Sequence, residues 1–244
     1  MMTGAQLVRG NSPAAAQLAP GVEIRVFCNG DTGAKDLTVC SATMEADTEI
    51  PYHTHPTSEG ISVLEGTASV FVEGRRYELS ALDAIHVPAG VPHAVRNQST
   101  ATAVLHTSFP TGSPERDFLD DTFGVEDRSE TDDAVPEKMV RAANAKRTDP
   151  PSGATCWDFF CAQTGARGIS GGNVEIMSGG TLPCPALPTD GTLAVATASA
   201  VVTMNDQRYE MRALDSLFVP AQTEYHLQNP SDTTLNVIRV YASD

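Results

Sequence analysis

Residues 76–83 read RYELSALD, and residues 208–215 read RYEMRALD. The two stretches are 132 residues apart, and the same spacing relates VPA at 87–89 to VPA at 219–221 with no gap between them. A register held over this length indicates an internal repeat, and an internal repeat determines the architecture before any single element does. The chain therefore contains two copies of one unit.

The repeat divides the chain into four parts. We expect an N-terminal extension at residues 1–21, a first unit at 22–112, a connecting segment at 113–153 and a second unit at 154–244. The connecting segment is acidic and poor in β-branched residues, which is typical of a linker. Within it, Pro136–Arg147 begins with proline and ends with basic residues, a pattern that predicts one helix.

The residue pattern inside each copy indicates short antiparallel strands. Ile61–Val72 (ISVLEGTASVFV) is a β-branched run that Glu65-Gly66 interrupts, as expected of two strands joined by a hairpin turn. Ala84–Val87 is another short apolar run, and Pro88 ends it. Several short strands at this spacing predict an all-β sandwich or barrel.

The composition limits the kinds of partner. The chain of 244 residues has 16 Lys and Arg against 31 Asp and Glu, a formal net charge of −15. Such a surface repels nucleic-acid phosphates and anionic membranes, so we expect neither as a partner. The sequence shows no signal-peptide core and no run of the roughly 20 apolar residues that span a bilayer, which favours a cytoplasmic protein. We expect the five cysteines, an odd number, to be unpaired thiols.

The histidines are concentrated in the first copy, which holds five of the six. His53 and His55 are two residues apart, and on a strand such residues point to the same face. Glu59 follows at the start of the next apolar run, and His93 follows a turn rich in Pro and Gly. Three imidazoles and one carboxylate suit Mn, Fe, Co, Ni, Cu or Zn. On an octahedral ion they leave two positions open, as a catalytic site requires.

These residues resemble the two sequence motifs of the cupin family. The matching residues are His53, His55, Glu59 and Gly66 of the first motif and Pro88, Gly90, His93 and Asn97 of the second. Asp47 and Leu82 depart from the pattern, because each motif opens with glycine at that position. The departures concern the shape of two loops and leave the four metal-binding positions intact.

The resemblance implies an all-β fold of two tandem, jelly-roll-like cupin barrels with an acidic, partly helical linker. It also implies that His53, His55, Glu59 and His93 hold one divalent transition metal (Fe, Mn, Ni or Zn) in the first barrel. Cupin barrels commonly pair through their edge strands. That pairing is satisfied either by the two barrels of one chain or by a homodimer.

The second copy lacks these ligands. The residues 132 positions after His53, His55, Glu59 and His93 are Pro185, Leu187, Gly191 and Tyr225. None of the first three binds a metal, and a lone tyrosine is a poor substitute. We therefore expect the second barrel to be degenerate and metal-free, with a structural role as the first expectation and the binding of a small molecule as the alternative.

Two further histidines of the first copy have two interpretations. His86 and His106 lie on expected strands and either line the same barrel, beside the metal or the substrate, or are packed in the core. Phe218 and Ile238 occupy the equivalent positions of the second copy, which favours packing. An inward-facing arginine would indicate a carboxylate ligand, and the sequence leaves open which arginine that is.

The resemblance implies a metal-dependent enzyme that acts on a small organic molecule inside the first barrel. Oxygenase-type chemistry is the leading expectation, and isomerase or lyase chemistry comes next. The alternative is a non-catalytic, metal-containing protein that binds or senses a small molecule. No helix-turn-helix pattern or basic patch accompanies the barrels, so a role in transcription lacks its usual partner domain.

Overall fold

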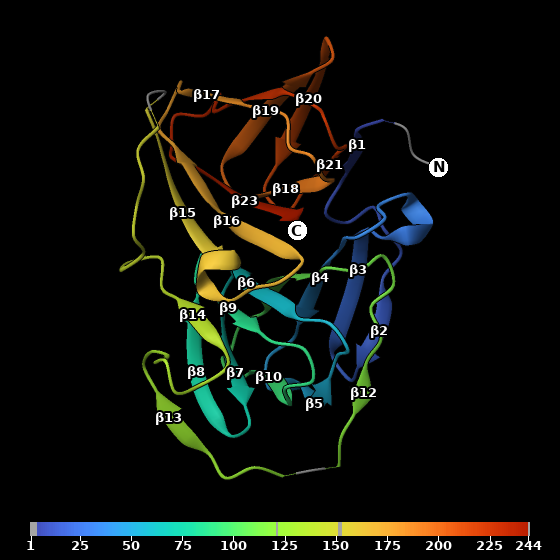
Figure 1. Ribbon diagram of the computed structural model, residues 1–244, viewed down its shortest axis with the longest axis vertical. Coiled ribbons are helices and arrows are strands. Elements are labelled where there is room, and N and C mark those ends of the chain that lie inside the picture. The colour runs from blue at the N-terminus through green and yellow to red at the C-terminus, as the bar shows by residue number, and fades with distance from the viewer. Residues whose placement is uncertain (1–3, 121, 151–152, 244) are drawn as a thin grey trace.

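The computed structural model describes residues 4–120, 122–150 and 153–243, which form two β-barrels side by side (Figure 1). The first barrel and its outer strands comprise β2 (Ala16–Ala19), β3 (Val22–Cys28), β4 (Thr38–Met44), β5 (Thr48–Thr54), β6 (Glu59–Glu65), β7 (Thr67–Val72), β8 (Arg75–Ser80), β9 (Ala84–Val87), β10 (His93–Asn97), β11 (Ala103–Phe109), β12 (Asp117–Phe118), β13 (Glu126–Arg128) and β14 (Lys138–Val140). The second barrel comprises β1 (Gln6–Val8), β15 (Ala154–Phe160), β16 (Ile169–Ile176), β17 (Thr181–Cys184), β18 (Gly191–Thr197), β19 (Ser199–Met204), β20 (Gln207–Arg212), β21 (Ser216–Val219), β22 (Tyr225–Gln228) and β23 (Leu235–Ala242). Two short 3₁₀ turns, Gly30–Thr32 and Ala162–Thr164, occupy equivalent loops of the two copies.

Each barrel consists of two sheets packed face to face. In the first barrel, a sheet of order β14-β9-β6-β11-β4-β3-β2 faces one of order β12-β5-β10-β7-β8-β13. In the second, β1-β21-β18-β23-β16-β15 faces β17-β22-β19-β20. The alternation of residues along each strand sends one set of apolar side chains into the barrel, where they form a separate core in each copy. The all-β, two-barrel architecture expected from the repeat is confirmed.

A third apolar core lies between the barrels and fixes them to each other. It takes Phe27, Leu37 and Val104 from the first barrel and Trp157 and Phe160 from the second, among others. These side chains project from the outer faces of the two larger sheets, so both faces of those sheets are buried. This explains why the strands read as nearly continuous apolar runs and not as alternating ones.

The N-terminal strand belongs to the second barrel. β1 pairs antiparallel with β21, with Gln6 opposite Phe218, although the following strand β2 pairs with β3 of the first barrel. β14 makes the matching addition in the first barrel, where it pairs with β9. Segments outside the repeat therefore pair with the same edge strand in both copies. This pairing leaves fewer free backbone groups at that edge for pairing with another chain.

The expected helix at Pro136–Arg147 is wrong. Lys138–Val140 forms strand β14, and turns follow it. The segment is extended because its side chains have partners on the first barrel. Glu137 is fully buried, and its carboxylate accepts hydrogen bonds from Arg75 Nε at 2.8 Å and from the Tyr77 hydroxyl at 2.6 Å. These long-range contacts outweigh the local helix preference, which is weak for a segment of this length.

No helix in the described ranges combines the length and apolar character needed to cross a membrane.

The packing between the barrels predicts the effect of one substitution. A Cβ placed on Gly60 would lie inside van der Waals distance of the Phe160 ring, which also packs on Gly171. We expect Gly60→Ala to force Phe160 out of its position and to lower the free energy of unfolding by about 1–3 kcal/mol, measured by chemical denaturation. Gly124→Ala is the matched control, because a Cβ there would meet no atom within 4 Å. Equal stability of the two variants would contradict this account of the interface.

Candidate metal centre

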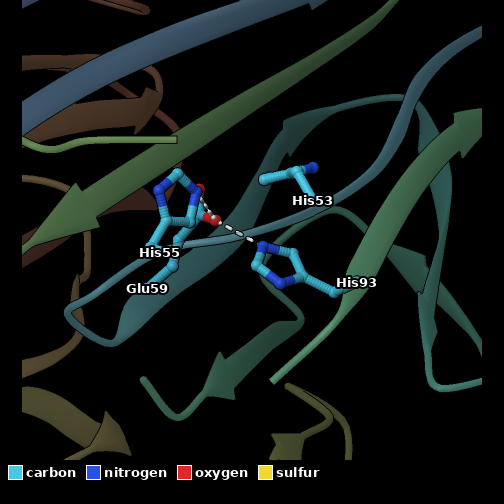
Figure 2. Close-up of side chains that lie close together, drawn as sticks. All are labelled: His53, His55, Glu59 and His93. Atoms are coloured by element: carbon cyan, nitrogen blue, oxygen red, sulfur yellow. Dashed lines mark hydrogen bonds and ion pairs between the residues drawn. The ribbon is translucent and has the colours of Figure 1, made fainter. Parts of the chain in front are cut away.

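His53, His55, Glu59 and His93 come together inside the first barrel (Figure 2). His53 is on β5, His55 lies just beyond its end, Glu59 begins β6 and His93 begins β10. One donor atom from each residue lies within 4.8 Å of the others, and each of the four residues is at most 4% exposed. The side chains that the sequence singled out as one cluster therefore do form one in space.

An irregularity in strand pairing turns His53 into the barrel. His93 lies opposite His53, whereas Val95 lies opposite Ile50, so β5 has one residue more than β10 in this stretch. Such a bulge shifts the alternation of side chains along the strand. As a result His53 follows Ile50 into the interior, and Tyr52 points away, where its hydroxyl accepts a hydrogen bond from the Gly74 backbone N–H at 3.1 Å.

Backbone carbonyls orient all three imidazoles. The Nδ1–H of His53 donates to the Pro51 carbonyl at 2.8 Å, that of His93 donates to the Val91 carbonyl at 2.9 Å, and that of His55 donates to the Glu115 carbonyl. A carbonyl only accepts, so the proton of each neutral ring is on Nδ1. The Nε2 lone pairs remain free for the interior, the arrangement that hydrogen bonds give to metal-binding histidines.

The electrostatics of the cluster fit a cation at its centre. The Glu59 carboxylate lies 2.8 Å from Nε2 of His93 and 3.3 Å from Nε2 of His55. Burial raises the pKa of Glu59, but the neighbouring rings of His55 and His93 outweigh burial and hold that pKa well below its usual value. Burial and the nearby His93 lower the pKa of His53 to about 3, so its ring is neutral. Among the described residues His55 Nε2 is buried without a hydrogen-bond partner. One carboxylate and converging nitrogen lone pairs match a divalent transition metal.

The segment after the first barrel adds two residues that the sequence did not indicate. β12 pairs with β5 and places Phe118 opposite His53, with ring centroids 5.8 Å apart. Arg116 lies two residues before Phe118, and its Nε is buried without a hydrogen-bond partner among the described residues. It directly follows Glu115, whose carbonyl holds the His55 ring, and its charge contributes to the lowered pKa of His53. No motif marks this arginine, which precedes an acidic stretch of the linker and reaches the site only through strand pairing.

The arginines nearest to the motifs in sequence have other partners. Arg75 pairs with Glu73 and Glu137, and Arg76 pairs with Asp127. Arg96 pairs with Glu49 and covers the Phe71 ring. These arginines are engaged in ion pairs, so Arg116 is the residue that has a guanidinium nitrogen free beside the cluster.

The two departures from the motif glycines leave the turns intact. Asp47 has φ 55° and Leu82 has φ 70°, both in the left-handed region that glycine adopts without strain. Leu214, the equivalent of Leu82 in the second copy, has the same φ of 70°. The backbone shape that glycine ordinarily supplies is thus kept by residues that adopt it at a cost of roughly 1–2 kcal/mol each.

The structure places His86 and His106 away from the cluster. Both are buried, but their neighbours Ala84 and Val104 on the same strand faces belong to the core between the barrels. The His86 ring lies 5.9 Å from that of Phe160. The side chains therefore point to the outer face of their sheet, the face opposite to the candidate metal ligands.

The second barrel has no bulge at the equivalent point. Cys184 pairs directly with Tyr225 in β17 and β22, just as His53 pairs with His93 in the first barrel. The residue that replaces His53 in space is therefore Cys184, and not Pro185, which the 132-residue spacing indicates. Counting along the sequence misses this difference because both copies have the same number of residues here. The bulge changes only which residue pairs with the neighbouring strand and which face its side chain occupies.

The buried histidines at the interface predict a pH dependence of stability. Burial lowers the pKa of His86 and of His106 from 6.5 to about 4. Between pH 6.5 and pH 4 the unfolded chain therefore binds more protons, and the free energy of unfolding falls as the pH falls. Between pH 7 and pH 5 each of these histidines should lower the free energy of unfolding by about 2 kcal/mol. We expect the double variant His86→Phe with His106→Ile, which carries the residues of the second copy, to lack this loss. Denaturant titrations at both pH values measure it. His226→Ala, at an exposed position, is the control. The assignment would be refuted if the double variant kept the pH dependence of the wild-type protein.

Comparison with known proteins agrees with the fold, and its family match spans the stretch that contains the cluster. Residues 41–109 match the family described as "Cupin domain". Quercetin 2,3-dioxygenase of Bacillus subtilis (strain 168) is 43% identical over 56 residues, a match that covers 22% of this chain and only 17% of that enzyme. Similarity to that enzyme is thus limited to one short stretch.

Solved structures resemble the whole chain. Oxalate decarboxylase from Bacillus subtilis at pH 4.6 superposes with a TM-score of 0.76 at 13% identity, over 100% of this chain and 78% of that one. AerE from Microcystis aeruginosa superposes with a TM-score of 0.71 at 14% identity, over 95% and 97% of the two chains. At these identities the likeness concerns the fold. The chain therefore has the two-barrel fold of these structures, and residues 41–109 of its first barrel match a cupin domain.

Proposed function

We propose that the first barrel, residues 22–112, is the site of a metal-dependent enzyme that acts on a small organic molecule. His53, His55, Glu59 and His93 would hold one divalent transition metal. The observation that carries the proposal is the convergence of three Nε2 atoms, each oriented by a backbone carbonyl, on one buried carboxylate. Clustered, oriented ligands of this kind mark a working site.

The chain's own residues prepare the site in three ways. The Nδ1 hydrogen bonds hold the imidazoles in one tautomer, and the low pKa of Glu59 keeps its carboxylate ionised at neutral pH. Burial excludes water and strengthens every electrostatic contact inside the barrel. When bound, a divalent transition metal supplies Lewis-acid or O₂-activating chemistry at the two coordination positions that four protein ligands leave open.

We infer that the substrate carries a carboxylate or another delocalised anion. Arg116 has a buried Nε without a protein partner, and guanidinium groups bind carboxylates in a bidentate manner. The Phe118 ring beside His53 offers an aromatic face to a flat substrate. Oxygenase-type chemistry is our first choice, which the short match to a quercetin dioxygenase supports. Isomerase or lyase chemistry is the next.

One observation favours a non-catalytic binding protein instead. All four candidate ligands are nearly inaccessible. A binding or sensing protein needs only slow exchange of its ligand, whereas an enzyme needs repeated access to these residues. Turnover of a small aromatic or aliphatic acid, followed by O₂ consumption or product detection, separates the two functions.

Loss of one ligand tests the metal site itself. We expect His55→Ala to reduce the metal content of the protein, purified without chelators, from about one ion per chain to a small fraction, because affinity falls steeply when a ligand is lost. Elemental analysis measures the metal, and circular dichroism checks the fold. His226→Ala is the matched control, since His226 is exposed in the second barrel. Full metal retention in His55→Ala would overturn the ligand assignment.

A second variant tests the role of Arg116. We expect Arg116→Met to weaken binding of a carboxylate substrate by about tenfold or more, seen as a raised KM or Kd, because a charge-assisted hydrogen bond is lost. The metal content should not change. Arg128→Met is the control, because Arg128 pairs with Glu126 and Asp132 on the surface. Equal affinities in the two variants would show that the substrate does not contact Arg116.

A further inference from the structure

The second barrel contains a pocket at the position of the first barrel's metal centre. Leu187, Gly191 and Tyr225 line it, and these are the counterparts of His55, Glu59 and His93. A small cavity therefore lies in the second copy where the candidate ligands lie in the first.

A guanidinium enters this pocket from β23. Leu235 and Val237 on this strand belong to the core of the second barrel, whereas Ile238 and Val240 belong to the core between the barrels. Strand alternation therefore points Arg239 into the second barrel, and Arg239 is among the lining residues. Its counterpart in the first barrel is Thr107. The positive charge inside the barrel is thus a property of the second copy.

Arg239 has no anionic partner in the described part of the chain. Its Nε is buried and lacks a hydrogen-bond partner. The ionisable groups that act on it are Tyr225, Cys184, Cys156 and Tyr241, two phenols and two thiols. Arg239 is only partly exposed, and a guanidinium that is largely withdrawn from water is ordinarily paired with an anion. The pocket therefore has the electrostatics of a site that lacks its anion.

The other lining groups limit the class of ligand. Burial raises the pKa of Tyr225, so its hydroxyl stays protonated beside the guanidinium. A metal cation would be repelled by Arg239, and a phosphate ordinarily requires more than one cation. The remaining walls combine the apolar side chains of Leu187, Leu193 and Val219 with the threonines Thr189, Thr192 and Thr223. One cation with neutral polar groups and partly apolar walls suits a small organic monoanion.

We propose that the C-terminal barrel binds a small organic carboxylate, with the guanidinium of Arg239 and the hydroxyl of Tyr225 as its donors. The site is separate from the metal centre of the first barrel and does not depend on the function proposed there. In this second copy a fixed side-chain cation takes the place that a bound metal cation takes in the first.

Acetate binding to the full-length, metal-loaded protein tests the proposal. We expect a saturable rise in melting temperature with acetate at constant ionic strength, and an apparent Kd that is weaker by about tenfold or more in Arg239→Met. Arg208→Met is the matched control, because Arg208 is an exposed arginine of the same barrel. Any acetate bound at the metal centre contributes equally to all three proteins, whose metal content is measured first. Identical titrations for wild type and Arg239→Met would overturn the proposal.

A second measurement does not rely on the folding of that variant. Tyr225→Phe keeps the ring and removes only the hydroxyl, so we expect acetate affinity to fall several-fold, by about the value of one hydrogen bond. A crystal structure of the wild-type protein grown with formate should show the carboxylate beside Arg239. Water alone at that position, with wild-type acetate affinity in Tyr225→Phe, would exclude the site.

Discussion

The site depends on three hydrogen bonds from imidazole Nδ1 atoms to backbone carbonyls. The carbonyls belong to Pro51, Val91 and Glu115, which lie on three different segments of the chain. The orientation of each ring is therefore set by the path of the backbone and not by other side chains. The rings themselves are buried in the close-packed interior of the barrel, and this packing helps to hold the lone pairs in alignment.

Equivalent inward-facing positions have different electrostatic roles in the two barrels. In the first barrel a bulge of one residue brings His53 to face His93, and the centre attracts a cation. In the second barrel regular pairing brings Cys184 to face Tyr225, and Arg239 supplies the positive charge. The scaffold is common to both copies, and the chemistry differs because a few inward positions on β5, β17 and β23 differ. The fold alone thus says little about what each barrel binds.

The repeat and the spacing of four ligands were sufficient to predict the two-barrel fold and the cluster in the first barrel. They failed where a contact between distant segments decides the outcome. The helix expected at Pro136–Arg147 is an extended segment because Glu137 is held by Arg75 and Tyr77. Arg116 reaches the cluster through the pairing of β12 with β5, which no local pattern indicates. His53 and Cys184 correspond in space through a bulge that counting along the sequence does not reveal.

The pairing of β1 with β21 of the second barrel has a consequence for folding during synthesis. Gln6–Val8 precedes the first barrel in the chain, yet its partner strand, which contains Phe218, follows that barrel. During synthesis β1 therefore has no sheet to join until β21 has been made. The first barrel has all of its own strands before then, so the order of synthesis favours completion of the first barrel before β1 pairs with the second.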